Sequence, residues 1–324
     1  MNYWLLSRQA VLNTPTCPYT FHEVVLLKAI DEIAIYLPHR ICECIRQIPR
    51  LDEISEIRFS LDKPAMVSYG GYTEVIKNKN MALVTDKIVF DFVISKLTGG
   101  SMYSVNESIK NGYVTIDGGH RVGICGTAVI DDGDIKHVKN ISSLCFRICR
   151  QIKGCADSIA LEIIEKGRIN NILIASPPGC GKTTILRDIC RIIGGGSSGI
   201  DIKRVGIADE RGEIAAMHDG VARFDVGLAS FVCDSYPKAY AMGLMLRSMS
   251  PDVLVTDEIG SIEDFAAVRN SLKSGVSVIA TAHASDIYDI KTRFDSEIKS
   301  FDKIIFLKGK GRISSVYRRK DNDY

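Results

Sequence analysis

The sequence predicts an α/β protein built from two domains, and three observations support this prediction. The second half alternates apolar strands with helical segments, which is the pattern of a parallel sheet with crossover helices. The first half mixes helices with strands of alternating polarity, as α+β domains do. A glycine-rich turn, "IASPPGCGKTT", joins a strand to a helix in the second half. We therefore expect an N-terminal extension over residues 1–20, an α+β domain over 21–152 and an α/β domain over 153–324.

The composition is that of a soluble globular protein, with 46% hydrophobic and 25% charged residues among 324. The formal net charge of +2 gives no overall field that would attract a polyanion. The N-terminus has only a short apolar run without a basic flank, so we expect no signal peptide. Every apolar run is shorter than the roughly 18 residues that span a bilayer. These features predict a cytoplasmic protein whose membrane contact, if any, is peripheral.

Two hydrophobic periods define the elements of the first half. Apolar residues recur at three- and four-residue steps in its helices and at every second residue in its strands. Pro64 closes a turn between two strands, and the triplet 117–119 supplies the turn of a hairpin. In order, the expected elements are a helix at 21–48, strands at 53–59 and 65–69, a helix at 86–97 and a hairpin at 112–130.

The second half begins after residues 151–157, which interrupt both patterns. Its apolar runs are short and bounded by charge or glycine, so they predict buried parallel strands. The run "GGGSSG" at 194–199 predicts a flexible loop. In order, the expected elements are a strand at 171–176, a helix from 182, a strand at 204–209, a helix at 237–249, a strand at 252–258, a helix at 263–273, a strand at 276–283 and a hairpin at 303–319.

The turn after the first of these strands has the parts of a phosphate-binding loop. Gly179 and Gly181 allow backbone N–H groups to point inward, and the helix N-terminus behind them favours an anion. Lys182 can reach the β- and γ-phosphates of ATP, and the Thr183 hydroxyl can bind Mg²⁺. The predicted nucleotide-binding residues are Ser176, Pro177, Pro178, Gly179, Cys180, Gly181, Lys182, Thr183 and Thr184.

Ser176 departs from the usual loop, because the consensus has glycine at this position. The position lies at the outer shoulder of the loop, where Pro177 and Pro178 can fix the turn in place of glycine. The alternative is an ordinary strand–turn–helix connection that happens to contain Gly-Lys-Thr. A second motif is needed to decide between a nucleotide loop and a plain turn.

That second motif is an apolar strand that ends in Asp257–Glu258. An aspartate there can hold the shell of Mg²⁺, and the adjacent glutamate can orient and deprotonate an attacking water. The alternative is a solvated acidic turn, but the two motifs together favour ATP hydrolysis with Mg²⁺. We therefore take Glu258 as the first candidate base, and Thr183 and Asp257 as the metal-binding residues.

A charge cluster ends another predicted strand, at Asp209, Glu210, Arg211 and Glu213. Ligands of open α/β sheets bind at the carboxyl ends of strands, so this cluster is a functional candidate and a solvated loop is the alternative. Glu210 is therefore a second catalytic candidate. Whether Glu258 or instead Glu210 or Glu213 is the base stays open at this point.

Two further candidates come from single residues. His283 ends a strand that also carries Thr281, and a histidine there can donate to a γ-phosphate and respond to its loss. The alternative for His283 is a structural histidine. Arg247 precedes the Asp257 strand, and an arginine at the edge of a nucleotide fold can act in trans on a neighbour's phosphate. The alternative for Arg247 is a surface arginine on a helix.

With these residues in place, the chain resembles the stage III sporulation protein AA family of endospore-forming Firmicutes. The resemblance covers most of the chain and implies a hexameric ATPase related to those of type II and type IV secretion, with a RecA-like core. It also implies a role in energising a membrane-spanning channel complex, and that family normally has serine at the position of Ser176. The segments that carry it are "EISEIRFSLDKPAMV", "NGYVTIDGGHRVGICGTAV", "SPPGCGKTTILRD", "DERGEIA", "FDVG", "YPKAYAMGLMLRSMSPDVLVTDEIG" and "GVSVIATAHA".

The C-terminal end independently favours a RecA-like core. Only a terminal hairpin follows the last predicted parallel strand, which is too short for the helical lid of an AAA+ protein. The hairpin carries a basic face that we expect to be solvated, with nucleic acid or anionic lipid binding as the alternative. This basic face comprises Lys308, Lys310, Arg312, Arg318, Arg319 and Lys320.

The function predicted from the sequence is a ring-forming motor ATPase that uses ATP and Mg²⁺ and drives a membrane channel complex. The expected partners are other copies of the chain, in a hexamer, and membrane proteins of that complex. A nucleic-acid-dependent RecA-like ATPase is one alternative, but the net charge and the lack of a stacking aromatic cluster disfavour it. A nucleotide-dependent assembly switch without sustained turnover is the other.

Overall fold

The computed structural model describes residues 29–49, 51–69, 71–100, 112–165, 167–196, 199–309 and 311–319. These residues form two compact units, one that ends at Arg150 and one that begins at Gln151. We call them the N-terminal unit and the C-terminal unit. The expected extension over residues 1–20 lies outside the described residues. No helix of the described segments is both long and apolar enough to cross a membrane.

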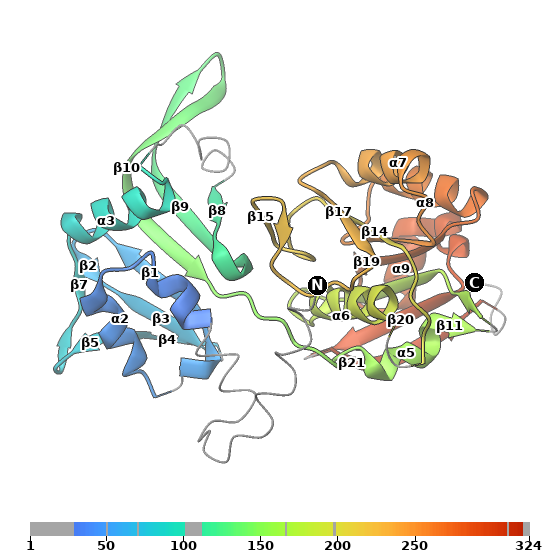
Figure 1. Ribbon diagram of the computed structural model, residues 1–324, viewed down its shortest axis with the longest axis horizontal. Coiled ribbons are helices and arrows are strands. Elements are labelled where there is room, and N and C mark those ends of the chain that lie inside the picture. The colour runs from blue at the N-terminus through green and yellow to red at the C-terminus, as the bar shows by residue number, and fades with distance from the viewer. Residues whose placement is uncertain are drawn as a thin grey trace, which may run out of the picture. The chain divides into compact units, whose positions relative to one another are not determined.

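The N-terminal unit is built on a six-stranded sheet in which all neighbouring strands are antiparallel (Figure 1). In spatial order, its strands are β4 (Tyr72–Val75), β3 (Met66–Tyr69), β1 (Ile54–Ser60), β10 (Asp134–Arg147), β9 (Arg121–Asp131) and β8 (Tyr113–Thr115). Two short ladders accompany it, formed by β2 (Lys63–Pro64) with β7 (Val84–Thr85) and by β5 (Lys77–Asn78) with β6 (Met81–Ala82).

Helices cover one face of this sheet and form a single hydrophobic core with it. Alternate residues point inward, so Ile57 and Phe59 of β1 are fully buried while Arg58 between them is exposed. The rings of Phe59 and Phe146 meet edge to face, with centroids 5.8 Å apart. The covering helices are a segment at 29–34, α2 (His39–Arg46) and α3 (Lys87–Leu97).

The single helix predicted over residues 21–48 is wrong in its described part. The chain is helical at 29–34, turns at 35–37 and becomes helical again in α2. Pro38 stands before α2 with φ −58° and ψ 142°, and it has no N–H group to donate within a helix. Proline also disfavours helical backbone at the preceding residue. The helical periodicity therefore continues across a break that Pro38 imposes.

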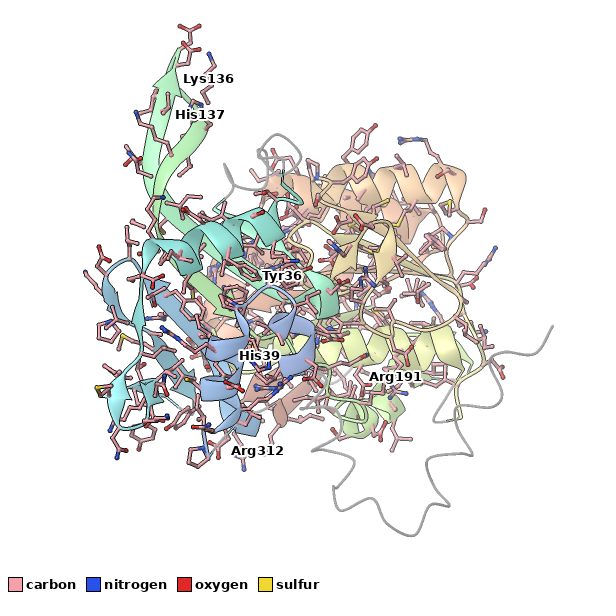
Figure 2. The ribbon with its side chains drawn as sticks, turned by 60° about the vertical axis from the view of Figure 1, so that its left-hand side comes forward. Tyr36, His39, Lys136, His137, Arg191 and Arg312 are labelled. Carbon is pink, nitrogen blue, oxygen red and sulfur yellow. The ribbon has the colours of Figure 1, made fainter. Side chains whose placement is uncertain are left out.

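The predicted hairpin at 112–130 is confirmed in β8 and β9, but β10 was not predicted. Strands β9 and β10 form a longer hairpin whose distal part, residues 127–139, carries Lys136 and His137 near its tip (Figure 2). The pairing shifts register between Lys139 and Ser143, opposite Gly126. A Cβ at Gly126 would lie 2.7 Å from the Lys139 carbonyl oxygen, so only glycine fits this bulge. We call residues 127–139 the hairpin arm.

The C-terminal unit is built on a seven-stranded sheet. Its strands are parallel except for the last, which pairs antiparallel with its neighbour. In spatial order they are β17 (Ser230–Asp234), β14 (Val205–Asp209), β18 (Val253–Thr256), β19 (Ser277–His283), β13 (Ile172–Ser176), β20 (Lys303–Lys308) and β21 (Arg312–Arg318). The predicted strands and terminal hairpin are confirmed, and the edge strand β17 was not predicted.

Helices cover both faces of this sheet, and each face has its own hydrophobic core. Within β13, Ile172 and Ile174 belong to one core, and Leu173 and Ala175 to the other. On the first face lie α5 (Asp157–Ile163) and α6 (Lys182–Gly195), and on the second α7 (Lys238–Ser248), α8 (Ile262–Lys273) and α9 (Ile287–Phe294) (Figure 1). The result is a three-layer α/β/α arrangement, in which α5 and α9 were not predicted.

The flexible loop predicted at 194–199 begins later than expected, because α6 continues through Gly195. A Cβ at Gly194 would lie 2.5 Å from the Ser230 Oγ, so the glycine lets α6 pass close to the start of β17. The remaining short elements are β11 (Ile164–Glu165) with β12 (Arg168–Ile169), β15 (Met217–His218) with β16 (Val221–Ala222), and 3₁₀ segments at Leu51–Glu53, Asp117–Gly119 and Asp295–Ser300.

Candidate functional site: a phosphate-binding loop and its acidic partners

The glycine-rich loop connects β13 to α6 at the carboxyl edge of the C-terminal sheet. β13 ends at Ser176 and α6 begins at Lys182, so the loop lies between the expected strand and helix. Gly179 and Gly181 have φ values of 74° and 93°, which residues with side chains rarely adopt. The N-terminus of a 14-residue helix stands directly behind the loop. This arrangement presents backbone N–H groups and a helix dipole to an anion.

Ser176 fits this loop without glycine because it still belongs to the strand. It is the last residue of β13, pairs in parallel register with His283 and is fully buried. Its hydroxyl donates to the carbonyl oxygen of Pro177 at 2.9 Å. The backbone at Ser176 is extended, so a side chain causes no strain there. The serine thus supports the first turn of the loop from inside.

Lys182 is folded back onto its own loop. Its Nζ donates to the carbonyl oxygens of Ser176 and Pro177, at 3.1 and 3.2 Å, and lies 3.0 Å from Nδ1 of His283. The residue is only 6% exposed. Burial lowers the pKa of Lys182, and the negative charge of Glu258 is the largest opposing influence. The ammonium is therefore poorly solvated and available for a stronger acceptor.

Thr183 and Asp257 meet across the gap between α6 and β18. The Thr183 Oγ1 donates to Oδ2 of Asp257 at 3.0 Å. Burial and, after it, the nearby carboxylate of Glu213 raise the pKa of Asp257 to about 6. The side chain is thus a buried carboxyl group with other carboxylates around it. A cation at this position would relieve both influences.

The donor set at Thr183 and Asp257 fits Mg²⁺ bound together with a nucleotide. Mg²⁺ prefers oxygen ligands and commonly takes one or two from protein, with the remainder from phosphates and water. Thr183 supplies one hydroxyl oxygen here, and Asp257 supplies one carboxylate oxygen. Within the described residues, no group of three or more His, Cys, Asp or Glu side chains could hold a metal ion alone. A metal at this site would therefore depend on phosphate oxygens.

Both carboxylate oxygens of Glu258 have partners. Oε1 is 2.8 Å from Nε2 of His283, and Oε2 forms an ion pair with Arg211. Since Nδ1 of His283 faces the ammonium of Lys182, the tautomer with a proton on Nε2 satisfies both contacts. His283 therefore connects the loop lysine to the acidic motif. The predicted candidates Glu258, Lys182 and His283 lie together in one hydrogen-bonded chain.

The backbone at Glu258 is left-handed, with φ 48°. Such a conformation is uncommon for a residue with a long side chain and persists where neighbours hold it. The Glu258 N–H donates to Oγ1 of Thr281 at 2.8 Å, and its carbonyl oxygen accepts from Nζ of Lys238 at 3.0 Å. Thr281 is fully buried. The threonine thus supports the backbone of Glu258.

The charged residues after β14 have different partners. Asp209 is buried, and its carboxylate accepts from the N–H groups of Glu213, Ile214 and Ala215 at 2.8, 3.0 and 2.8 Å. It thereby shapes the loop that follows. Glu210 lies 3.0 Å from the ammonium of Lys238. The charge of Glu213 raises the pKa of Asp257.

Arg247 does not join this constellation. It is exposed in the last turn of α7, which precedes the amino end of β18. The acidic motif follows the opposite end of that strand.

The terminal hairpin contacts the glycine-rich loop. The carbonyl oxygen of Cys180 accepts a hydrogen bond from the N–H of Gly311, in the turn of this hairpin, at 2.8 Å. The side chains of Lys308 and Arg312 in that hairpin are exposed.

Two residues of the site were not predicted from the sequence. Lys238 contacts both acidic motifs, and Arg187 of α6 donates to the carbonyl oxygens of Glu213 and Ile214. The Arg187 guanidinium also lies over the ring of Phe224, 3.9 Å from its centroid. In the sequence, each is only a basic residue within a predicted helix, and nothing else in the pattern indicates its contacts. Both residues tie the loop after β14 to neighbouring elements.

The parallel sheet, the loop between β13 and α6, and the acidic residues after β18 define a RecA-like P-loop fold. Three solved structures share it. These are the ATPase DotB of Yersinia pseudotuberculosis (TM-score 0.56, 15% identity, 83% of this chain and 75% of that chain), the ATPase DotB of Legionella pneumophila (0.53, 15%, 90% and 78%) and the pilus retraction motor PilT with ADP (0.53, 16%, 83% and 76%). At these identities the likeness concerns the fold.

The chain belongs to the sporulation stage III protein AA family, whose model matches residues 28–323. It is 35% identical over 302 residues to stage III sporulation protein AA of Bacillus subtilis, which covers 90% of this chain and 96% of that protein. The uncharacterized protein ycf45 of Porphyra purpurea is 24% identical over 258 residues, 79% of this chain and 41% of that protein. The family resemblance noted from the motifs is thus confirmed.

Proposed function

We propose that this protein is an ATP-hydrolysing motor that works as a ring and energises a membrane-associated channel complex during sporulation. One observation carries the hydrolytic part of the proposal. The carboxyl edge of a RecA-like sheet brings together a loop lysine, a hydroxyl paired with a buried carboxylate, and a glutamate held by a histidine and an arginine. These are the groups that phosphoryl transfer to water requires.

The loop residues would bind and orient the triphosphate. The N–H groups between Gly179 and Thr183 would donate hydrogen bonds to the phosphate oxygens. Lys182 would exchange its loop carbonyls for phosphate oxygens, which are stronger acceptors. This exchange would also release Nδ1 of His283 from the ammonium. His283 would therefore respond to the presence of the nucleotide, as the sequence suggested.

Thr183 and Asp257 would hold Mg²⁺ beside the phosphates. When bound, Mg²⁺ supplies positive charge that neutralises the β- and γ-phosphate oxygens as the bond between them breaks. The raised pKa of Asp257 supports this assignment, because a buried carboxylate without a cation is unfavourable. The hydrogen bond from Thr183 keeps the two oxygens close to each other.

Glu258 is the base that we assign. In the reaction, the water oxygen would attack the γ-phosphorus, the bond to the ADP oxygen would break, and Glu258 would accept the proton from the water. Glu258 contacts His283, which in turn contacts the loop lysine, whereas Glu210 contacts Lys238 and Asp209 accepts from backbone N–H groups. Because His283 and Arg211 occupy both oxygens of Glu258, one of these contacts would have to open to admit the water.

The ring and the membrane complex rest on likeness to other proteins. PilT is a pilus retraction motor, and the Bacillus subtilis relative is a stage III sporulation protein. We propose a homo-hexamer located in the cytoplasm that contacts membrane proteins of its complex at the membrane face. Nucleic acid has no part in this proposal.

The test compares the purified wild-type protein with Lys182→Ala and Glu258→Gln in ATP binding, ATP turnover and sedimentation. Lys182→Ala should weaken ATP binding by more than about 100-fold, since it removes the charge that faces the phosphates. Glu258→Gln should bind ATP normally and lose turnover, because the amide has the same shape and no basic oxygen pair. With ATP, Glu258→Gln should sediment as a species several times the mass of the 35.7 kDa monomer.

Each alternative function predicts a different result in the same assays. Turnover that appears only when RNA or DNA is added would indicate a nucleic-acid-dependent ATPase. Tight ATP binding with assembly but no sustained turnover in the wild type would indicate an assembly switch. Unchanged ATP affinity in Lys182→Ala would contradict the assignment of the loop. Turnover that persists in Glu258→Gln would move the base to Glu210 or Glu213.

A further inference from the structure

Lys238 is the first residue of α7, a position that is unfavourable for lysine on three counts. Its side chain is only 11% exposed, so the ammonium is largely removed from water. A positive charge at a helix N-terminus also opposes the helix dipole. Finally, a long side chain loses rotamer freedom when it is held in one position. Its specific contacts must offset these three effects.

Those contacts join the ends of two neighbouring strands. The Lys238 Nζ donates to the main-chain oxygen of Glu258 at 3.0 Å and lies 3.0 Å from Oε2 of Glu210. Glu258 follows β18 and Glu210 follows β14, and these two strands pair in parallel register. One ammonium therefore links the acidic motif that contains the proposed base with the charge cluster of the adjacent strand.

The contact to Glu258 is directed at its backbone, which is the strained part of the residue. Glu258 has φ 48°, its N–H donates to Thr281 Oγ1, and its carbonyl oxygen accepts from Lys238. The N–H of Ile259, in the same peptide as that carbonyl, donates to the Thr281 carbonyl oxygen at 2.8 Å. Without the donor on the carbonyl side, this peptide would be held by the Ile259 N–H alone and could rotate toward a more common conformation. The Glu258 carboxylate would then shift relative to His283 and to the phosphate site.

We infer that Lys238 is a positioning residue for hydrolysis, which holds Glu258 in its left-handed conformation and ties it to Glu210. The inference rests on the proposed function, since it concerns the same site. Lys238 acts through Glu258 and not on the nucleotide, because both of its acceptors are protein oxygens at the far side of the acidic motif from the loop lysine. Its removal should therefore slow turnover and leave ATP binding intact.

The experiment measures kcat, KM, the ATP dissociation constant and thermal unfolding of Lys238→Met beside the wild type. We expect kcat to fall about 10- to 100-fold, as a displacement of the base by a fraction of a bond length can produce. The ATP dissociation constant should stay within about threefold of the wild type. If Lys238→Met does not fold, Lys238→Gln, which keeps much of the side-chain volume, replaces it. The same changes in kcat and in the ATP dissociation constant are then expected.

Lys303→Met is the matched control, because Lys303 is also a buried lysine with a carboxylate partner. Its Nζ lies 2.7 Å from Oε2 of Glu162, and its side chain is 7% exposed. Lys303 is the first residue of β20, so it lies at the amino end of a parallel strand, away from the site edge. This variant should unfold at a lower temperature and keep kcat within about twofold of the wild type.

Glu210 provides a second check on the link between the two motifs. If Lys238 acts by joining Glu210 to Glu258, the double variant Lys238→Met with Glu210→Gln should lose little more kcat than the more impaired single variant. Losses in kcat that multiply in the double variant would overturn the link. They would mean that the two residues affect turnover independently.

The failures of the inference and of the proposed function give different results. If the wild type binds and hydrolyses ATP but Lys238→Met keeps kcat within twofold, the inference alone is overturned. A loss of ATP affinity as large as the loss of kcat would also overturn it, because a general structural defect acts on both. A wild type that neither binds nor hydrolyses ATP would reject the proposed function, and the inference with it.

Discussion

The two sheets of this protein differ in where they keep their charged residues. The C-terminal sheet is covered on both faces, so its charges gather at the strand ends, where Lys182, Asp209 and Asp257 are all buried. Among the residues that the structure describes, helices cover one face of the N-terminal sheet, and Arg58 and Arg147 lie exposed on the other. When both faces of a sheet are buried, functional side chains can lie only at the ends of its strands. When one face is exposed, the side chains on that face can contact another molecule.

The difference also determines what a charge does to stability. At the C-terminal edge, removal from water shifts the pKa values of Lys182 and Asp257 and makes each group need a partner. On the open face of the N-terminal sheet, solvent screens the arginines and their ion pairs contribute little. We define this open face by the cross-strand row Glu56, Arg147 and Arg121. Substitutions can test the contrast directly.

The largest expected effect is on the covered face of the N-terminal sheet. Phe146→Ala should lower the free energy of unfolding of this unit by about 3–5 kcal/mol, since it leaves a cavity against Phe59 in the core. Denaturant unfolding monitored by hydrogen exchange of β1 and β10 would measure it. Arg147→Ala, on the opposite face of the same strand, is the control and should change that free energy by less than about 0.5 kcal/mol.

The second prediction concerns a buried charge of the C-terminal edge. The pKa of Asp257 is raised to about 6 from 3.8, so the folded protein disfavours its ionised form. This penalty is absent well below pH 3.8, grows as the pH rises from 3.8 to about 6, and levels off above that at about 3 kcal/mol as an upper limit. Asp257→Asn removes it, so the nucleotide-free variant should be more stable than the wild type at pH 7.5.

Thermal unfolding of both proteins without nucleotide, at pH 4 and at pH 7.5, measures this difference. The gain of Asp257→Asn should nearly vanish at pH 4, where the wild-type carboxyl group is largely protonated. The same variant should lose the stabilisation that Mg²⁺ and ATP give to the wild type. An Asp257→Asn protein that is less stable at pH 7.5 would show that the ionised carboxylate is satisfied without a cation.

The sequence predicted the C-terminal unit better than the N-terminal one, and the reason is the same contrast. Parallel strands buried on both faces are continuous apolar runs, so β13, β14, β18 and β19 were recognisable without knowledge of their neighbours. Strand β10 was missed because only one of its faces is apolar and its distal part, in the hairpin arm, is mostly exposed. Its Asp132–Gly133 turn was the available signal.

For the site, the sequence predicted the residues with chemical motifs and not those that hold them. The loop and Asp257–Glu258 are recognisable because the chemistry requires those residue types at that spacing. Lys238 has no such signature, since its burial results from the adjacency of β14 and β18 in the folded sheet. Likewise, the ion pair of Arg211 with Glu258 joins residues 47 positions apart. Contacts of this kind depend on the tertiary structure.

The last prediction concerns Arg147 and Arg121, whose substitution should change stability least and which test whether copies of the chain share a nucleotide site. Arg147 and Arg121 face each other directly across β9 and β10, and like charges in that position are unfavourable in a sheet. Arg147 is 63% exposed, and its Nε is 3.8 Å from Oε1 of Glu56. If the protein works as a ring, we predict that these arginines serve the nucleotide site of a neighbouring copy.

Arg147→Ala should then hydrolyse ATP at least about 10-fold more slowly, with unchanged ATP affinity and unfolding free energy, because such a contact matters most in the transition state. Lys87→Ala, which removes another exposed cation of the same unit, should keep wild-type turnover.

Mixing Arg147→Ala with Glu258→Gln across a range of ratios separates a shared site from an indirect effect. A mixed interface that pairs an intact Arg147 with an intact Glu258 would restore activity above the sum of the two proteins. Activity equal to that sum at every ratio would remove Arg147 from the shared site and leave Arg121, Arg150, Arg211 and Arg247 to be tested in the same way.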